Sequence, residues 1–192
     1  MKIGVVMDPI VSISPKKDST LAMLLEAQSR GWETYCMEIG DLRLRDGVAE
    51  ASMRRVHVQD DLHSWFELGP ANLLPLRQLD MVLMRKDPPV DVEYITATYI
   101  LDRAEAEGVL VANRPAALRD TNEKIFPHWF PQCCPPSLVT RSRRTLLEFL
   151  KAQESIVVKP TNAMGGRSIF LVRAGDPNTT VIFEEMTQHE ER

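Results

Sequence analysis

The chain has 192 residues, of which 44% are hydrophobic and 26% are charged, and its formal net charge at pH 7 is −4. This is the balance of an ordinary globular protein with enough apolar material for a buried core. The acidic charge balance excludes a basic surface field for nucleic acid, and no apolar run approaches the length that spans a membrane.

The cysteines and the first residues bear on the compartment. Cys36, Cys133 and Cys134 form neither a CxxC pair nor an even disulfide framework, and adjacent cysteines rarely bridge each other without strain. The first residues enter a strand-like run directly, without the basic, apolar and small-residue order of a signal peptide. We therefore expect reduced thiols in a cytoplasmic protein.

Strand and helix signals alternate in the first half of the chain. Asp18 or Ser19 can cap a helix that ends near Gly31, and a second helix follows an apolar track from Val92 until Gly108. The expected strands lie at 2–7, 33–39, 80–84 and 109–112, with a hairpin over 42–58 around Asp46 and Gly47. This alternation predicts an α/β domain with a mostly parallel sheet covered on both faces.

The organisation changes near residue 113. Segment 116–130 is expected to be helical with an interruption at Pro127, and 133–136 is expected to be a linker because paired prolines cannot continue a helix. Then follow an expected helix at 143–153, a strand at 156–160, a turn at 161–166, a strand at 168–173 and a helix at 181–188. This second part has roughly half the material of a stable domain. The sequence therefore predicts two domains, 1–120 and 121–192.

Residues 159–166 are a candidate phosphate site. Lys159 ends an expected strand, and a turn with Gly165 and Gly166 follows it. Glycine lets the backbone approach a phosphate closely, and a lysine adds a point charge for the same anion. The alternative is a plain β-hairpin with Lys159 in solvent, and local sequence alone favours that alternative. The Walker pattern GxxxxGK[ST] is absent.

A second candidate site follows the expected strand at 80–84. Arg85, Lys86 and Asp87 would lie in the crevice beyond the carboxyl ends of the strands, where open α/β sheets bind ligands. These charges could hold an amino-acid-like substrate, with Arg85 gripping a carboxylate through two hydrogen bonds. A charged loop ended by prolines is an equal alternative. Lys17 lies in another strand-to-helix loop, for which a solvated loop is favoured, and the four histidines lack metal spacing.

Taken together, these segments resemble the prokaryotic glutathione synthetase family. The segments that carry the resemblance are MDPI at 7–10, KKDST at 16–20, AMLLEAQSRG at 22–31, MRKDPP at 84–89, ATYILDRAE at 97–105, RDTNEK at 119–124 and KPTNAMGG at 159–166. Each is weak alone, MRKDPP is the most specific, and their common order is strong evidence. The resemblance extends from residue 1 to about residue 176.

The resemblance implies a pre-ATP-grasp domain at 1–120 and an incomplete α+β ATP-grasp lid lobe at 121–192. It implies a cytoplasmic homo-oligomer that uses ATP and Mg²⁺ to join γ-glutamylcysteine and glycine through an acyl phosphate. Carried over to this chain, the ATP-binding residues are Lys124, Lys159, Gly165, Gly166 and Ser168. The substrate-binding residues are Arg85, Lys86 and Asp87, with Lys17 as a weaker candidate.

The resemblance also sets limits. The family's magnesium carboxylates and glycine site lie beyond the matching part, so we expect no metal ligands here and no glutathione synthesis by this chain alone. Asn162 and Ala163 stand where the family usually has an acidic residue and a glycine. The alternatives are a noncatalytic remnant or interaction module, and another ATP-grasp carboxylate–amine ligase, which the MRKDPP segment disfavours.

Overall fold

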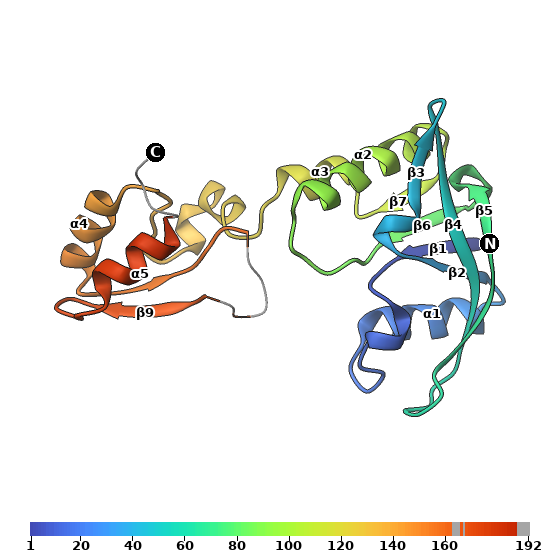
Figure 1. The fold of residues 1–192 in the computed structure, drawn as a ribbon, viewed down its shortest axis with the longest axis horizontal. Helices are drawn as coiled ribbons and strands as arrows, with labels where there is room; N and C mark the ends of the chain where they lie inside the picture. The colour runs from blue at the N-terminus through green and yellow to red at the C-terminus, as the bar shows by residue number, and fades with distance from the viewer. Residues whose placement is uncertain (163–165, 167, 188–192) are drawn as a thin grey trace. The chain divides into compact units, whose positions relative to one another are not determined.

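The computed structural model describes residues 1–162, 166 and 168–187. The chain forms two compact units, Met1–Asp120 and Thr121–Arg192 (Figure 1). None of the helices in the described ranges is long and apolar enough to cross a membrane.

The first unit is built around a seven-stranded sheet. Its strands are β1 (Lys2–Val6), β2 (Glu33–Met37), β3 (Leu42–Arg45), β4 (Val48–Val58), β5 (Phe66–Pro75), β6 (Met81–Met84) and β7 (Leu110–Ala112). The order is β3-β4-β2-β1-β6-β7, and β5 pairs with β4. Strands β1, β2, β6 and β7 pair in parallel, whereas every pairing of β4 is antiparallel. Helix α1 (Ser19–Ser29) covers one face, and α2 (Val92–Ala106) with α3 (Pro115–Asp120) covers the other (Figure 1).

The α/β class expected from the sequence is confirmed, and the sheet is mixed. The antiparallel part comes from the hairpin around residues 46 and 47 and from β5, which the sequence patterns did not predict. Gly69 and Pro70 lie inside β5 and act as turn signals in a sequence. A proline has no N–H to donate, and it is tolerated here because β5 is an edge strand that pairs with β4 on one side.

Local signals explain where the elements begin and end. The side chain of Asp18 accepts a hydrogen bond from the Leu21 amide at 2.8 Å, which caps α1. Asp91 caps α2 in the same way through the Tyr94 amide. Asp46 and Gly47 both have positive φ angles, 49° and 80°, as the tight turn between β3 and β4 requires.

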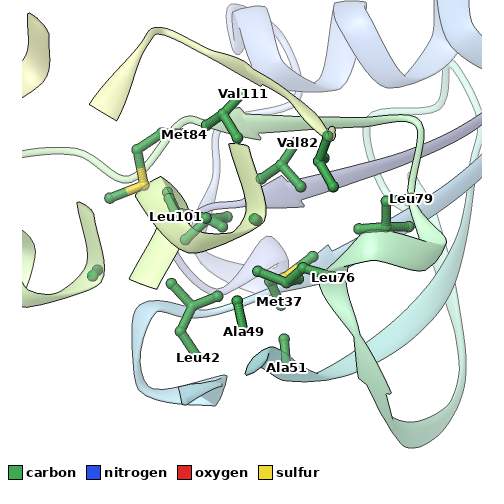
Figure 2. Packing of buried hydrophobic residues seen from close by; sticks show 14 of the residues in the cluster. Met37, Leu42, Ala49, Ala51, Leu76, Leu79, Val82, Met84, Leu101 and Val111 are labelled. Carbon is green, nitrogen blue, oxygen red and sulfur yellow. The ribbon is translucent and has the colours of Figure 1, made fainter. Parts of the chain in front are cut away.

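Two apolar clusters fill the space between the sheet and its helices. The larger one joins β1, β2, β4 and β6 to α2, and Figure 2 shows it around Leu101, which is fully buried. The smaller one lies under α1 and contains Val5 and Leu24. Consecutive residues Val5 and Val6 belong to different clusters because strand side chains alternate between faces. The carboxyl ends of β1 and β6 are thus fixed by packing on both sides.

The second unit is small. It contains α4 (Arg143–Gln153), β8 (Ser155–Val158), β9 (Phe170–Arg173) and α5 (Thr179–Met186), and β8 and β9 pair antiparallel. One face of this pair packs against the helices through Leu150, Ile156, Val158, Val172 and Phe183. On the opposite face Val157 and Leu171 are cross-strand neighbours and are 54% and 53% exposed. The helix and strands expected at 143–173 are therefore present, with β9 beginning at Phe170.

The segment expected to be an interrupted helix at 116–130 is organised differently. Helix α3 ends at Asp120, and two short 3₁₀ turns follow at Phe126–Trp129 and Pro131–Cys133. The side chain of Asn122 accepts hydrogen bonds from the amides of Lys124 and Ile125, which diverts these donors from a helix. Pro127 lies at the start of the first 3₁₀ turn, where its missing N–H costs little, and so begins an element.

The three cysteines are free thiols with different surroundings, and they allow a test of packing in the first unit. Burial raises the pKa of Cys36 from its ordinary value of 9.0 to about 11, and the nearby Arg54 opposes this rise. We expect iodoacetamide at pH 8 to alkylate the exposed Cys133 at least about tenfold faster than Cys36, because the thiolate is the nucleophile.

The same shift has a consequence for stability. An acid whose pKa is higher in the folded state favours folding below its unfolded pKa, so Cys36 loses its contribution to stability between pH 9 and about pH 11.

Peptide mass mapping of the alkylated thiols over time would measure the alkylation rates of Cys36 and Cys133. Equal rates in the native protein, matching those in 8 M urea, would contradict the buried position of Cys36.

Candidate active site

The residues after β6 lie at the carboxyl edge of the parallel strands. Val6 of β1 is in register with Met84 of β6, and the amide of Arg85 donates to the Val6 carbonyl at 2.7 Å. Residues 85–89, which are predicted to bind substrate and are called the substrate loop from here on, therefore leave the sheet beside the end of β1. This is the edge where parallel sheets place their ligand crevices.

The Arg85 side chain is held by the start of α1. Its Nε donates to the hydroxyl of Thr20 at 3.2 Å, and its Nη2 donates to the hydroxyl of Ser19 at 2.9 Å. Burial raises the pKa of Tyr94, and the positive charge of Arg85 opposes that rise, which places the guanidinium within electrostatic reach of α2. Among the described residues, the side-chain partners of Arg85 are two neutral hydroxyl groups, so its charge is available to an anion.

Lys86 and Asp87 are fastened to the end of β1 instead. The Lys86 ammonium forms an ion pair with Asp8 at 2.9 Å and also donates to the Asp87 carbonyl at 2.8 Å. The amide of Asp87 donates to the other oxygen of Asp8 at 2.9 Å, and the Asp87 side chain is exposed. The positive charge of Lys86 is thus compensated within the protein, in contrast to that of Arg85.

Lys17 is exposed in the turn directly before α1. Its amide donates to the Ser14 carbonyl at 3.0 Å, which forms part of that turn. The next residues are the helix cap Asp18 and the two hydroxyl residues that contact Arg85. The chain therefore brings Lys17 to the neighbourhood of the substrate loop.

Two of the cavities in the first unit differ in how they relate to the predicted site residues. One of about 140 Å³ opens at the carboxyl ends of β1 and β2, and Asp8, Glu38 and Arg54 are among its lining residues. Asp8 thus lines this cavity and also contacts the substrate loop. The other, of about 300 Å³, is lined by residues of α1, β2, β4 and β5 such as Gln28 and Arg55, and by none of the predicted site residues.

The two candidate ATP lysines belong to segments that a single amide joins. The side chain of Asn122 donates to the Thr161 carbonyl at 3.0 Å while its oxygen accepts from the Lys124 amide at 2.9 Å. Lys124 is largely shielded and lies 3.1 Å from the Glu123 carboxylate. Lys159 is exposed and directly follows β8. Asn122 thus ties the residues around both lysines into one substructure.

The turn after Lys159 is described in part. Gly166 has a φ of +76°, and Ser168 has a φ of +55°, a conformation that is uncommon for a residue with a side chain. Gly165 and Ala163 lie outside the described residues, so the expectations attached to them stay predictions. Asn162 is exposed.

Metal ligands were not expected in this chain. Over residues 1–162, 166 and 168–187, no group of three or more His, Cys, Asp or Glu side chains is arranged to hold a metal ion.

The chain matches known proteins over nearly its whole length. Residues 1–119 match the model of the prokaryotic glutathione synthetase N-terminal domain, and residues 123–192 match that of the prokaryotic glutathione synthetase ATP-grasp domain. The chain belongs to the prokaryotic glutathione synthetase family. It is 53% identical to the glutathione synthetase of Yersinia pestis over 98% of its own length and 59% of that protein. For the glutathione synthetase of Escherichia coli K12 the identity is 51%, over 98% of this chain and 60% of that protein.

Solved structures support the fold of this glutathione synthetase family member. A D-alanyl-alanine synthetase A from Vibrio cholerae superposes with a TM-score of 0.57 at 13% identity, covering 97% of this chain and 56% of that one. The ATP-grasp ligase PsnB gives 0.52 at 16% identity, covering 98% of this chain and 62% of that one. Matches at such low identity show the fold alone, and this fold is that of ATP-grasp ligases. The chain spans about three-fifths of the relatives it matches.

Sequence reasoning missed the residues that hold the predicted ones in place. Asp8, Ser19, Thr20 and Asn122 were seen only as strand-end, cap or motif residues. Their contacts with the substrate loop and with Thr161 span 39 to 79 positions along the chain. The carboxylate of Asp8, two positions after the buried strand β1, is a local signal for such a role.

Proposed function

We propose that this protein takes part in glutathione synthesis, as an ATP-dependent ligase that joins γ-glutamylcysteine to glycine. The observation that carries the proposal is the Arg85 guanidinium. It lies at the carboxyl edge of a parallel sheet and is oriented by two neutral hydroxyls. A cation so held is suited to a carboxylate ligand, and membership of the glutathione synthetase family supports γ-glutamylcysteine as that ligand.

The substrate loop would bind the dipeptide. The Nε and Nη2 atoms of Arg85 face α1, so a carboxylate would approach through the Nη1 and Nη2 end of the fork. Lys86 and Asp87 would support the loop through Asp8. Lys17 would add positive potential from the neighbouring turn.

The second unit would bind ATP. Lys124 and Lys159 would neutralise phosphate charge, and the backbone at Gly165, Gly166 and Ser168 would cover the phosphates. The positive φ angles of Gly166 and Ser168 support a backbone that turns its amides toward an anion. The exposed apolar pair Val157 and Leu171 beside Lys159 supports a ligand with an apolar face.

The proposed reaction balances in two steps. A carboxylate oxygen of the dipeptide attacks the γ-phosphorus of ATP, the bond to ADP breaks, and an acyl phosphate forms. The glycine amine then attacks the acyl carbon, a C–N bond forms, and phosphate leaves as the amine loses a proton. Lysine ammonium groups stabilise the charge that spreads over the transferring phosphoryl group.

Magnesium belongs to the proposal as the cation that accompanies ATP. The described residues offer no set of ligands for it, so we derive no step through the metal. We further propose a cytoplasmic protein that assembles as a homo-oligomer. Light scattering of the purified protein would measure this assembly.

The test uses the full-length protein that carries this chain, incubated with ATP, Mg²⁺, γ-glutamylcysteine and glycine. We expect glutathione by mass spectrometry and phosphate release that requires both amino substrates. Two control assays test for another carboxylate–amine ligase: in the first D-alanine is supplied in place of glycine, and in the second it is supplied in place of both amino substrates. Phosphate release with D-alanine as the only amino substrate would favour that other ligase over glutathione synthesis.

A further inference from the structure

We propose that Asp8 is a positioning residue for the peptide substrate. Its carboxylate fixes the backbone of the substrate loop and neutralises Lys86, so that Arg85 is the loop cation that meets the carboxylate of γ-glutamylcysteine. The inference rests on the proposed function, because it concerns the same ligand.

The contacts of Asp8 carry this inference. One oxygen pairs with the Lys86 ammonium and the other accepts from the Asp87 amide, each at 2.9 Å. The side chains of Lys86 and Asp8 are only 22% and 34% exposed, so the pair is partly shielded from water. Both oxygens of a residue two positions beyond β1 are thus committed to the loop.

The loop has three successive ties to the end of β1. The first is the backbone bond from Arg85 to Val6, and the other two run through the side chain of Asp8. Without Asp8, only the first tie remains, and the backbone beyond Arg85 can shift. The guanidinium then keeps its bonds to Ser19 and Thr20, but the backbone that follows Arg85 no longer fixes its place relative to the carboxyl edge as closely. Misplacement of a binding group by about 1 Å weakens binding steeply.

Electrostatics gives the same residue a second role. Lys86 follows Arg85 directly and carries the same charge. Paired with Asp8, it is held toward β1 and is compensated. Released, it can compete with Arg85 for a carboxylate, and its strongly hydrated point charge does not fix the orientation of the ligand. Asp8 therefore selects which of two adjacent cations binds the peptide.

Two substitutions separate these roles in the full-length protein. Asp8→Ala removes both contacts, whereas Asp8→Asn keeps an oxygen for the Asp87 amide and removes the charge. Asp102→Asn is the matched control, because Asp102 pairs with Arg119 at 2.7 Å with similar exposures of 31% and 18%, on helices away from the loop. Thermal unfolding verifies that all three variants fold.

We expect Asp8→Ala to raise KM for γ-glutamylcysteine about tenfold while KM for ATP changes less than about twofold, with a smaller rise for Asp8→Asn. Hydrogen exchange followed by NMR should quicken at the Asp87 amide in Asp8→Ala about tenfold. Asp102→Asn should change neither quantity.

Each other outcome has a definite meaning. Equal rises of both KM values, or Asp8 variants that behave like Asp102→Asn, overturn the positioning role. An unchanged exchange rate at Asp87 overturns it independently of any activity. If the wild-type protein makes no glutathione, the proposed function fails, and with it the role of Asp8 toward this dipeptide, whatever the exchange data show.

Discussion

Replacing Arg85 with alanine should raise KM for γ-glutamylcysteine about a hundredfold and leave KM for ATP within about twofold. The reason is that the substitution removes charged hydrogen bonds from the guanidinium to the dipeptide carboxylate and none to ATP. The guanidinium contacts only neutral hydroxyls among the described residues. Its removal therefore deletes a positive charge that no buried carboxylate of the first unit depends on. Initial rates with one substrate varied at a time would measure both constants.

Two further variants sharpen this expectation. Arg85→Lys keeps the charge but loses the planar fork, and we expect it to recover only part of the dipeptide affinity. Arg103→Ala is the control, because Arg103 is an exposed arginine of α2 whose Nε donates to the Gly47 carbonyl at 3.4 Å. An equal effect of Arg85→Ala on both substrates would remove Arg85 from the peptide site.

Replacing Lys159 with alanine should lower kcat/KM for ATP about a hundredfold and change KM for γ-glutamylcysteine little, because the ammonium stabilises phosphoryl charge. Lys159 is exposed after β8, so its loss should not affect folding. Lys124→Ala should act in the same direction. Its ion pair with Glu123 is exposed on the glutamate side and contributes little to stability.

Lys151→Ala is the control for both lysines, since Lys151 is an exposed lysine of α4 in the same unit. We expect its kinetics to match the wild type. Nucleotide affinity measured by calorimetry would separate binding from the chemical step. A Lys159→Ala protein that binds and uses ATP as well as the Lys151→Ala protein would rule out a phosphate role for Lys159.

Much of the fold could be predicted because its signals are local. A cap at Asp18, a turn at Asp46 and Gly47, and apolar alternation within each strand act over a few residues. Strand β5 escaped prediction because Gly69 and Pro70 interrupt its pattern, and its stability comes from pairing with β4. The 3₁₀ turns after Asp120 escaped because Asn122 redirects amides that a helical pattern assigns elsewhere.

The sequence could predict candidate-site residues only where they lie in a recognisable motif. The substrate loop and the lysines at 124 and 159 are of this kind. Their partners are ordinary residues whose importance depends on long-range contacts, such as that of Thr20 with Arg85 across 65 positions. Nor did the sequence indicate that Lys86 is compensated and Arg85 is not, because Asp8 meets Lys86 only after β1 and β6 have paired.

The parallel register of β1 with β6 has a consequence for how this protein can evolve. Val6 is in register with Met84, and the amide of Arg85, the residue that follows β6, donates to the Val6 carbonyl. Side chains alternate along a strand, so the gain or loss of one residue within β6 would turn Arg85 toward the opposite face of the sheet. Substitutions in the loop change its chemistry one side chain at a time, whereas a change in the length of β6 displaces every group in it together. The position of the MRKDPP segment relative to the buried Val82 therefore matters to the candidate site, as the side chains of the segment do.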